Sequence, residues 1–261
     1  MNTALWAAKT GLDAQQTRMA VVSNNLANVN TTGFKRGRAV FEDLLYQNVT
    51  QVGSATSQDT QSPSGMSLGT GVKVVATEKI FTQGSLNQTG NSLDLAINGR
   101  GFFQILMPDG SFAYTRAGDF QLNNQGQMVT SEGYVVQPGI NIPTGAQSIT
   151  IGADGTVSVQ VAGQSAPSQV GNIQLADFVN PAGLQPRGEN LLVESAASGT
   201  AQTGTPGLSG LGSIGQGETE SSNVNVVEEM VNMIETQRAY EMNTKAIQTT
   251  DQMLQYLSNN V

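Results

Sequence analysis

Residues 226–254 read VVEEMVNMIETQRAYEMNTKAIQTTDQML, and every seventh position of this stretch, counted from its first residue, carries a large and mainly apolar side chain. These positions are Val226, Met233, Tyr240, Ile247 and Leu254. Near the start of the chain the same spacing recurs at Leu5, Leu12, Met19 and Leu26. Because seven residues make nearly two helical turns, each series forms one narrow stripe along a helix. A stripe this narrow needs a partner helix, so we predict that these nine residues form an assembly interface.

Two terminal helices follow from these patterns, one over residues 4–28 and one from Asn225 to about Leu257. Asn225 and Glu228 match a capping box at the start of the second helix. Val227 and Ile234 lie off its main stripe, which indicates contacts on more than one side. We therefore expect the two helices to pair with each other and to pack against further copies of the chain.

Between the helices the pattern changes to short runs of alternating apolar and polar residues, such as 93–97 and 149–151. Turn formers separate these runs at residues 108–110, 123–126 and 153–155, which read PDG, NNQG and ADG. Turns of this composition join antiparallel strands. The many short strands, with no helical pattern among them, predict an all-β middle, so the expected fold class is α+β.

This interpretation divides the chain into five parts. They are an N-terminal assembly helix and turn (1–33), an extended segment that stiffens the polymer (34–71), a central β domain (72–198), a glycine-rich linker (199–222) and a C-terminal assembly helix (223–261). Residues 47–70 are poor in apolar groups and rich in Ser, Thr, Gln and Gly, so they should have no core of their own. Seven glycines between positions 199 and 217 are typical of a linker.

The composition excludes several functional classes. The chain has 12 Lys and Arg against 20 Asp and Glu, a net charge of −8, which disfavours binding to nucleic acid. It contains no Cys and no His, so it lacks thiols, the usual zinc ligands and the usual general base. We expect no metal, no cofactor and no enzymatic activity. No apolar run is long enough to span a bilayer, and the first residues do not resemble a cleaved signal peptide, so any export should proceed without one.

Two local patterns admit other interpretations. The glycines from Gly204 to Gly212 lack the Lys-Ser/Thr ending of a phosphate-binding loop. Glycosidases use pairs of carboxylates, for which the candidates would be Asp94, Asp109, Asp119 and Asp154. Asp109 and Asp154 precede glycines in turns, however, where such side chains bond the local backbone. A secreted carbohydrate-binding β domain stays open as an alternative, although it would need an aromatic-lined groove and only 5% of the residues are aromatic.

Three stretches resemble the family of bacterial flagellar rod and hook proteins. Residues 23–36 read SNNLANVNTTGFKR, residues 94–103 read DLAINGRGFF, and residues 222–241 run from SNVNV to QRAYE. The most specific motif is carried by Asn24, Asn25, Leu26, Ala27, Asn28, Thr32, Gly33 and Phe34. The resemblance spans nearly the whole chain. Within the family, the chain length and residues 41–71 are most similar to distal-rod members, with a proximal-rod or hook-type paralogue as the alternative.

The resemblance implies a structural axial subunit of the distal rod, the drive shaft of the flagellum. Such subunits self-assemble into a hollow helical tube that transmits torque and passes exported proteins. The implied partners are further copies of the chain, proximal rod proteins, the hook protein, the P-ring and L-ring proteins and the flagellar type III export apparatus. The implied location is the basal body, from the periplasm to the outer membrane. An uncharged polar lumen would suit the passage of unfolded chains, and the candidates to face it are Asn232, Thr236, Asn243 and Thr250.

Overall fold

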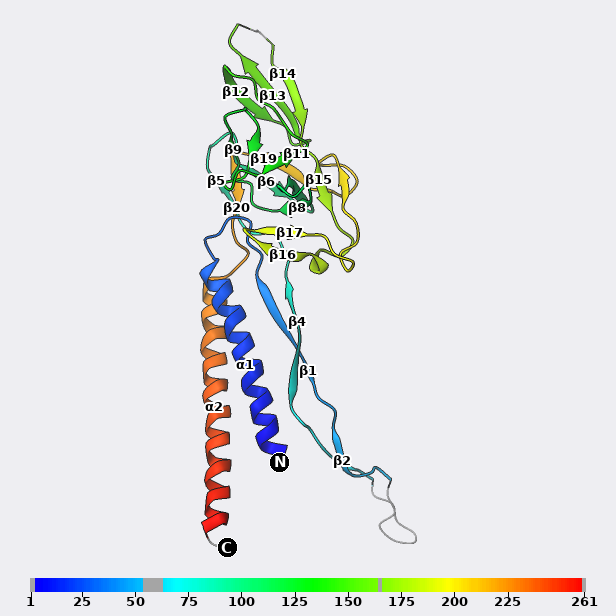
Figure 1. The fold of residues 1–261 in the computed structure, drawn as a ribbon, viewed down its shortest axis with the longest axis vertical. Helices are drawn as coiled ribbons and strands as arrows, with labels where there is room; N and C mark the ends of the chain where they lie inside the picture. The colour runs from blue at the N-terminus through cyan, green and yellow to red at the C-terminus, as the bar shows by residue number, and fades with distance from the viewer. Residues whose placement is uncertain (1–2, 54–62, 164–165, 260–261) are drawn as a thin grey trace. The chain divides into compact units, whose positions relative to one another are not determined.

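The structure, a computed structural model, describes residues 3–53, 63–163 and 166–259, which form two compact units (Figure 1). The terminal unit comprises Met1–Ala27, Gly37–Glu78 and Asn225–Val261. The central unit comprises Asn28–Arg36 and Lys79–Val224. The chain therefore passes from one unit to the other four times, and neither unit is a continuous stretch of sequence.

The terminal unit contains the two predicted helices, α1 (Thr3–Ala27) and α2 (Val226–Asn259), packed side by side (Figure 1). They run antiparallel, since Arg18 lies at Asn232 whereas Gly11 lies at Asn243. The side-chain oxygen of Asn225 accepts hydrogen bonds from the backbone N–H groups of Val227 and Glu228, at 3.0 and 3.4 Å. This caps the first turn of α2, as the sequence predicted.

Four short strands complete the terminal unit. β1 (Gly37–Asp43) pairs with β4 (Val72–Lys79), and β2 (Gln47–Thr50) pairs antiparallel with β3 (Met66–Leu68). β1 and β4 run beside α1, where the hydroxyl of Thr10 accepts a hydrogen bond from the backbone N–H of Val72 at 3.3 Å. The segment expected to be extended (34–71) thus supplies β1, β2 and β3 to two two-stranded ribbons, and β4 follows it. Residues 54–62 of that segment lie outside the described residues.

The central unit is made of short antiparallel strands, which confirms the predicted α+β fold class. Its strands are β5 (Leu86–Gln88), β6 (Leu95–Asn98), β7 (Phe102–Leu106), β8 (Phe112–Thr115), β9 (Gln121–Leu122), β10 (Met128–Val129), β11 (Val135–Gln137), β12 (Ala146–Ile151), β13 (Thr156–Val161), β14 (Ser168–Asn172), β15 (Leu175–Asp177), β16 (Gln185–Gly188), β17 (Leu191–Val193), β18 (Gln202–Gly204), β19 (Ser213–Gln216) and β20 (Glu218–Glu220). A short 3-10 helix spans Pro181–Gly183. The largest sheet has the order β16-β17-β8-β7-β11-β10-β9, with β15 and β18 joined to it beside β7. Smaller sheets are formed by β12-β13-β14, by β19-β6 and by β20-β5.

Strand β7 lies between two hydrophobic clusters. Phe103 and Ile105 face the larger cluster, where the Phe103 ring meets Phe120 edge to face with centroids 5.1 Å apart. Phe102, on the opposite side of the strand, packs in the smaller cluster against Phe178, at 5.9 Å between ring centroids. Because successive side chains of a strand point to opposite faces, burial on both sides requires the nearly continuous apolar run FFQIL.

The predicted turns close their hairpins through side-chain hydrogen bonds. Asp109, between β7 and β8, accepts a bond from the backbone N–H of Ser111 at 2.9 Å. Asp154, between β12 and β13, accepts one from Thr156 at 3.1 Å. Gly110 and Gly155 follow these residues with φ angles of 80° and 83°, a region that glycine adopts without strain. Both aspartates therefore serve the local backbone.

The glycine-rich segment 199–222, expected to be a linker, contains β18, β19 and β20, each paired with another strand of the central unit. Its glycines serve the turns between these strands, with φ angles of 77° at Gly207, 83° at Gly210 and 76° at Gly217. Glycine content alone does not distinguish a flexible linker from a chain of tight turns. The central unit accordingly extends to Val224. Strand β4 was expected at the start of this unit, but all of it except Lys79 belongs to the terminal unit.

Candidate functional site

The predicted assembly stripes keep much of their apolar surface uncovered in the single chain. On α1 the buried residues are Ala14, Val22 and Asn25, whereas Leu5, Leu12, Met19 and Leu26 are only half-buried. On α2, Met233 and Ile247 are half-buried, and the exposed members are Val226, Tyr240 and Leu254. These surfaces are available to other copies of the chain. That the stripes form the interface between copies stays a prediction.

The first turns of α2 expose a second apolar face. Val227 is 70% exposed, and Met230, Val231 and Ile234 are each about half exposed. Residues 227, 231 and 234 recur at the spacing of one helical face, and the sequence singled out two of them. Among the described helical residues, this face is the most apolar surface left open near the start of α2, and it points to contacts beyond the helix pair.

The four candidates for a lumen lie along one line of α2, part of which faces α1. The Oδ1 atom of Asn232 accepts a hydrogen bond from Arg18 at 3.3 Å, and Thr236 is fully buried, with its hydroxyl donating to the carbonyl of Asn232 at 2.6 Å. The amide of Asn243 lies over Gly11, where an added Cβ would be 3.1 Å from Nδ2. Thr250 donates to the carbonyl of Ala246 at 2.7 Å. Their role in a lumen stays a prediction about an assembled tube.

The Asn-rich motif after α1 is held by its own amides. Asn25, buried at the end of α1, donates to the carbonyl of Gly37 at 2.9 Å and accepts from the Gly37 N–H at 2.8 Å. This pair of bonds imitates a strand neighbour and attaches the start of β1 to the helix end. Asn28 closes the following turn by accepting a bond from the Thr31 hydroxyl at 3.2 Å.

Gly33 is the motif residue under the strictest geometric demand. Its φ is +70°, and a Cβ added there would lie 2.4 Å from the backbone nitrogen of Ala117. Its N–H donates to the carbonyl of Glu220 at 2.8 Å. The carbonyl of Thr32 accepts a bond from Asn190 at 3.2 Å, and Phe34 is buried. The other motif residues Asn24, Leu26 and Ala27 lie in the last turn of α1, where Asn24 and Ala27 are exposed and Leu26 is half-buried.

A buried ion cluster lies next to this motif within the central unit. The Oε1 atom of Glu220 accepts from Lys35 Nζ at 2.6 Å, and its Oε2 atom accepts from Arg116 Nη1 at 3.2 Å. The three side chains are 0%, 3% and 5% exposed, for Glu220, Lys35 and Arg116 in that order. Lys35 also donates to the carbonyl of Thr82 and Arg116 to that of Gly99, at 2.8 and 2.6 Å. These bonds serve Lys35 Nζ, both oxygens of Glu220 and the terminal nitrogens of Arg116, whereas the buried Nε of Arg116 has no partner.

Burial sets the electrostatics of this cluster. Desolvation lowers the pKa of Lys35 and of Arg116, and the carboxylate of Glu220 opposes that shift in both. Removing one partner from a buried ion pair typically costs about 3 to 5 kcal/mol, because it leaves an uncompensated charge. This arrangement could not be predicted from the sequence, because Glu220 lies in the glycine-rich segment, far along the chain from both cations, and a contact over such a separation has no local signature.

Asn223 adds further hydrogen bonds beside the ion cluster. Its Nδ2 atom donates to the carbonyl of Ile80 at 2.8 Å, and its Oδ1 atom accepts from the N–H of Arg36 at 2.8 Å. The motif segment, residues 79–82 and residues 220–223 are thereby fastened together at the places where the central unit begins and ends. The Asn223 side chain therefore holds these backbone segments in place.

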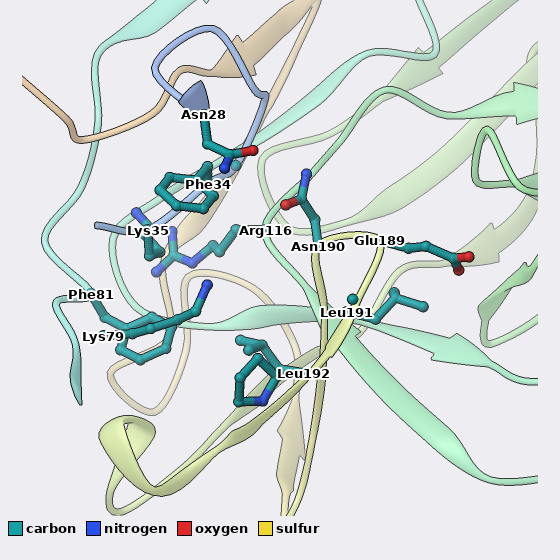
Figure 2. A pocket seen from close by; sticks show the side chains of 13 residues that line it. Asn28, Phe34, Lys35, Lys79, Phe81, Arg116, Glu189, Asn190, Leu191 and Leu192 are labelled. Carbon is teal, nitrogen blue, oxygen red and sulfur yellow. The ribbon is translucent and has the colours of Figure 1, made fainter. Parts of the chain in front are cut away.

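A pocket of about 210 Å³ adjoins the ion cluster (Figure 2). Its apolar wall includes Phe34, Phe81 and Leu192, and its polar groups include Lys79 and Arg116. Every lining residue belongs to the central unit.

In the described part of the chain, no helix is sufficiently long and apolar to cross a membrane.

Three family models match the chain, one at each terminal helix and one in the strands of the central unit. Residues 5–35 match a family model described as "Flagella basal body rod protein", residues 96–159 match "Flagellar hook protein FlgE/F/G D1 domain", and residues 216–260 match "Flagellar basal body rod FlgEFG protein C-terminal". The first match covers α1 and the Asn-rich motif, and the last covers β20 and α2.

Full-length relatives carry the same description. The chain is 58% identical over 258 residues to the flagellar basal-body rod protein FlgG of Buchnera aphidicola subsp. Schizaphis graminum, covering 99% of each chain. It is 52% identical over 256 residues to FlgG of Caulobacter vibrioides, covering 98% of each chain. With FlgG of Borreliella burgdorferi the identity is 48% over 261 residues, covering 99% of this chain and 98% of the other.

Proposed function

Because the chain belongs to the flagellar basal-body rod protein family, we propose that its function is mechanical: many copies polymerise into the distal rod, the shaft that transmits torque. It is a structural protein and not an enzyme. Members of this family assemble with themselves and with other axial components of the flagellum, and this chain is a component of the basal-body rod.

The observation that carries the proposal is the incomplete burial of the terminal helices. Each helix leaves a continuous apolar stripe half-covered or exposed after the two have paired. Burying such surface is worth about 25 cal/mol per Å², so further helices from neighbouring copies would stabilise it. A monomer has no comparable means of covering these side chains. The nine stripe residues are therefore proposed as the contacts between copies.

The finer assignments rest on the expected architecture of the tube. Its neighbours along the axis would be proximal rod proteins and the hook protein, and the P-ring and L-ring proteins would surround it between the periplasm and the outer membrane. Subunits would arrive through the flagellar type III export apparatus and travel along the lumen. Only 12% of the residues are charged, which suits a shaft turning inside a ring because few fixed ion pairs would form across the gap.

Sedimentation of the purified full chain over a range of concentrations tests the proposal. Copies should associate cooperatively as the concentration rises, and electron micrographs of the product should show tubes of uniform diameter. A chain that remains monomeric at every concentration, and that also fails to restore rods to cells lacking it, would contradict the proposed function.

A further inference from the structure

The pocket beside the ion cluster carries an excess of positive charge. Lys35 and Arg116 share a single carboxylate, that of Glu220, and Lys79 adds a third cation to the pocket wall. Glu189 also lines the pocket, but it accepts a hydrogen bond from the Tyr134 hydroxyl at 3.2 Å, and Figure 2 shows its carboxylate directed away from Lys79. A cationic pocket is unexpected in a chain whose net charge is −8.

Lys79 is the cation that lacks a counterion. Its ammonium lies 4.8 Å from the centre of the Phe34 ring, and no ion pair to a carboxylate is found for it among the described residues. Burial lowers the pKa of Lys79, with no neighbouring charge to oppose the shift. The adjacent Nε of Arg116 is buried and has no hydrogen-bond partner. An anionic group entering this pocket would relieve both deficiencies.

The dimensions of the pocket limit what can enter. Its volume of about 210 Å³ is below the range of about 300 to 1,000 Å³ that is usual for small-molecule sites. The wall is partly apolar, from Phe34, Phe81 and Leu192, and the charge lies at Lys79 and Arg116. An occupant therefore needs a carboxylate and an apolar group close together, as in a short peptide segment.

One segment of this chain presents such a pair. Leu45, between β1 and β2, is 90% exposed, the highest value among the large apolar residues of the described chain. Asp43 is exposed and has no ion-pair partner among those residues, whereas the neighbouring Glu42 is already paired with Lys73 at 3.1 Å. In extended chain, residues two apart point the same way and lie about 6.6 Å apart.

The backbone of this segment is held so that both side chains point outward. The N–H of Leu44 donates to the carbonyl of Gly71 at 2.9 Å, and the carbonyl of Leu45 accepts from the Thr70 hydroxyl at 2.7 Å. Leu44, between the two exposed residues, is half-buried. A preorganised segment loses little conformational entropy when it docks.

We infer that the Lys79 pocket of one copy receives the Asp43–Leu45 segment of a second copy. The Asp43 carboxylate binds the Lys79 ammonium, and the Leu45 side chain packs on the apolar wall. This inference rests on the proposed self-assembly and adds a lateral contact made outside the helical stripes. The contact joins the terminal unit of one copy to the central unit of the next.

Carbodiimide cross-linking of the polymer tests this contact directly, because the reagent condenses a touching ammonium and carboxylate into an amide with loss of water. The polymer is grown from an equal mixture of ordinary and ¹⁵N-labelled full-length chains, and cross-linked peptides are identified by mass spectrometry. The expected product joins Lys79 to Asp43 and includes pairs of mixed isotope composition. The Lys73–Glu42 pair, which lies within one chain, is the internal control and should give uniform isotope pairs only.

Charge exchange gives an independent measurement. Lys79→Glu and Asp43→Lys should each slow polymerisation severalfold, and the double variant should restore the rate. Lys73→Glu, a change of the same charge at an exposed position, should leave the rate unchanged. Tubes that form with Lys79 unlinked, linked to another carboxylate, or linked to Asp43 only within one chain would overturn this inference while leaving the proposed function intact. Failure of the unmodified chain to polymerise would contradict both.

Discussion

Lys35 and Glu220 are separated by 185 residues of sequence, yet the Lys35 ammonium lies 2.6 Å from the Glu220 carboxylate in the interior of the central unit. Glu220 also accepts the N–H of Gly84 at 2.9 Å and shares its other oxygen with Arg116. One carboxylate therefore fastens the N-terminal, middle and C-terminal parts of that unit.

Glu220→Gln should destabilise the central unit by about 3 to 5 kcal/mol, because two cations lose their buried counterion. Urea unfolding followed by the β-sheet circular-dichroism signal measures the loss. The matched control is Glu78→Gln, which removes the carboxylate from the more exposed pair with Arg38 and should cost less than about 1 kcal/mol. Equal losses of unfolding free energy in the two variants would show that burial does not increase the contribution of the cluster to stability.

Gly33→Ala should be more damaging than an alanine at another left-handed glycine. Both Gly33 and Gly110 have positive φ, and forcing alanine into that region costs about 1 to 2 kcal/mol. At Gly33 the new Cβ would also meet the backbone of Ala117 at 2.4 Å, which adds about 1 to 3 kcal/mol of overpacking, whereas no atom lies within 4 Å at Gly110. Denaturation midpoints of the two variants provide the comparison, and a Gly110→Ala loss as large as that of Gly33→Ala would rule out the close approach.

Ile247→Asp should abolish polymerisation and leave the central unit folded. The substitution puts a carboxylate in the middle of the α2 stripe, and burying it unpaired between copies costs several kcal/mol, on the order of 3 to 5. Pelleting assays and circular dichroism on the same preparation separate the two effects. Gln248→Asp, at the exposed neighbouring position, is the charge-matched control. Normal tubes from Ile247→Asp would mean that the stripe is not an interface.

Deleting residues 47–63 should turn a straight rod into a bendable tube while both helical stripes still allow assembly. The deleted segment contains β2 and the exposed apolar residues Val49 and Val52, which are suited to contacts with neighbouring copies. Electron micrographs of the deletion polymer report its curvature. A variant with the same residues in scrambled order separates length from sequence, and straight tubes from the deletion would place the stiffness elsewhere.

The carboxyl of Asp109 should titrate near pH 2. The Ser111 hydroxyl is the main cause, followed by the Ser111 N–H and Arg187, and together they lower the pKa of Asp109 from 3.8 to about 2. The lowered pKa means that the stabilisation is fully present above pH 3.8 and is lost as the pH falls through about 2. Ser111→Ala should move the pKa back toward 3.8 in a carboxyl NMR titration, and an unchanged titration would exclude the hydroxyl as the cause.

The features predicted successfully from the sequence are those whose signal is local, within a few neighbouring residues or a short repeat. The heptads and the Asn225 cap indicated both helices, and Asp109 and Asp154 marked their hairpins, since each signal lies within a few residues. The Asn25 amide and the Lys35–Glu220 pair depend on folded distances and have no such signal. Glycines 207, 210 and 217 predict a linker although they lie in turns, because composition does not report whether a positive φ is used in a turn.

The four passages of the chain between its two units mean that each unit needs residues that are far apart in the sequence. A chain that emerges from its N-terminus exposes Lys35 long before Glu220 exists to neutralise it, so the central unit cannot close until most of the protein has been made. Until then the buried cations have no place in a folded core. An incomplete chain that ends before residue 220 therefore lacks the carboxylate that neutralises both buried cations of the central unit.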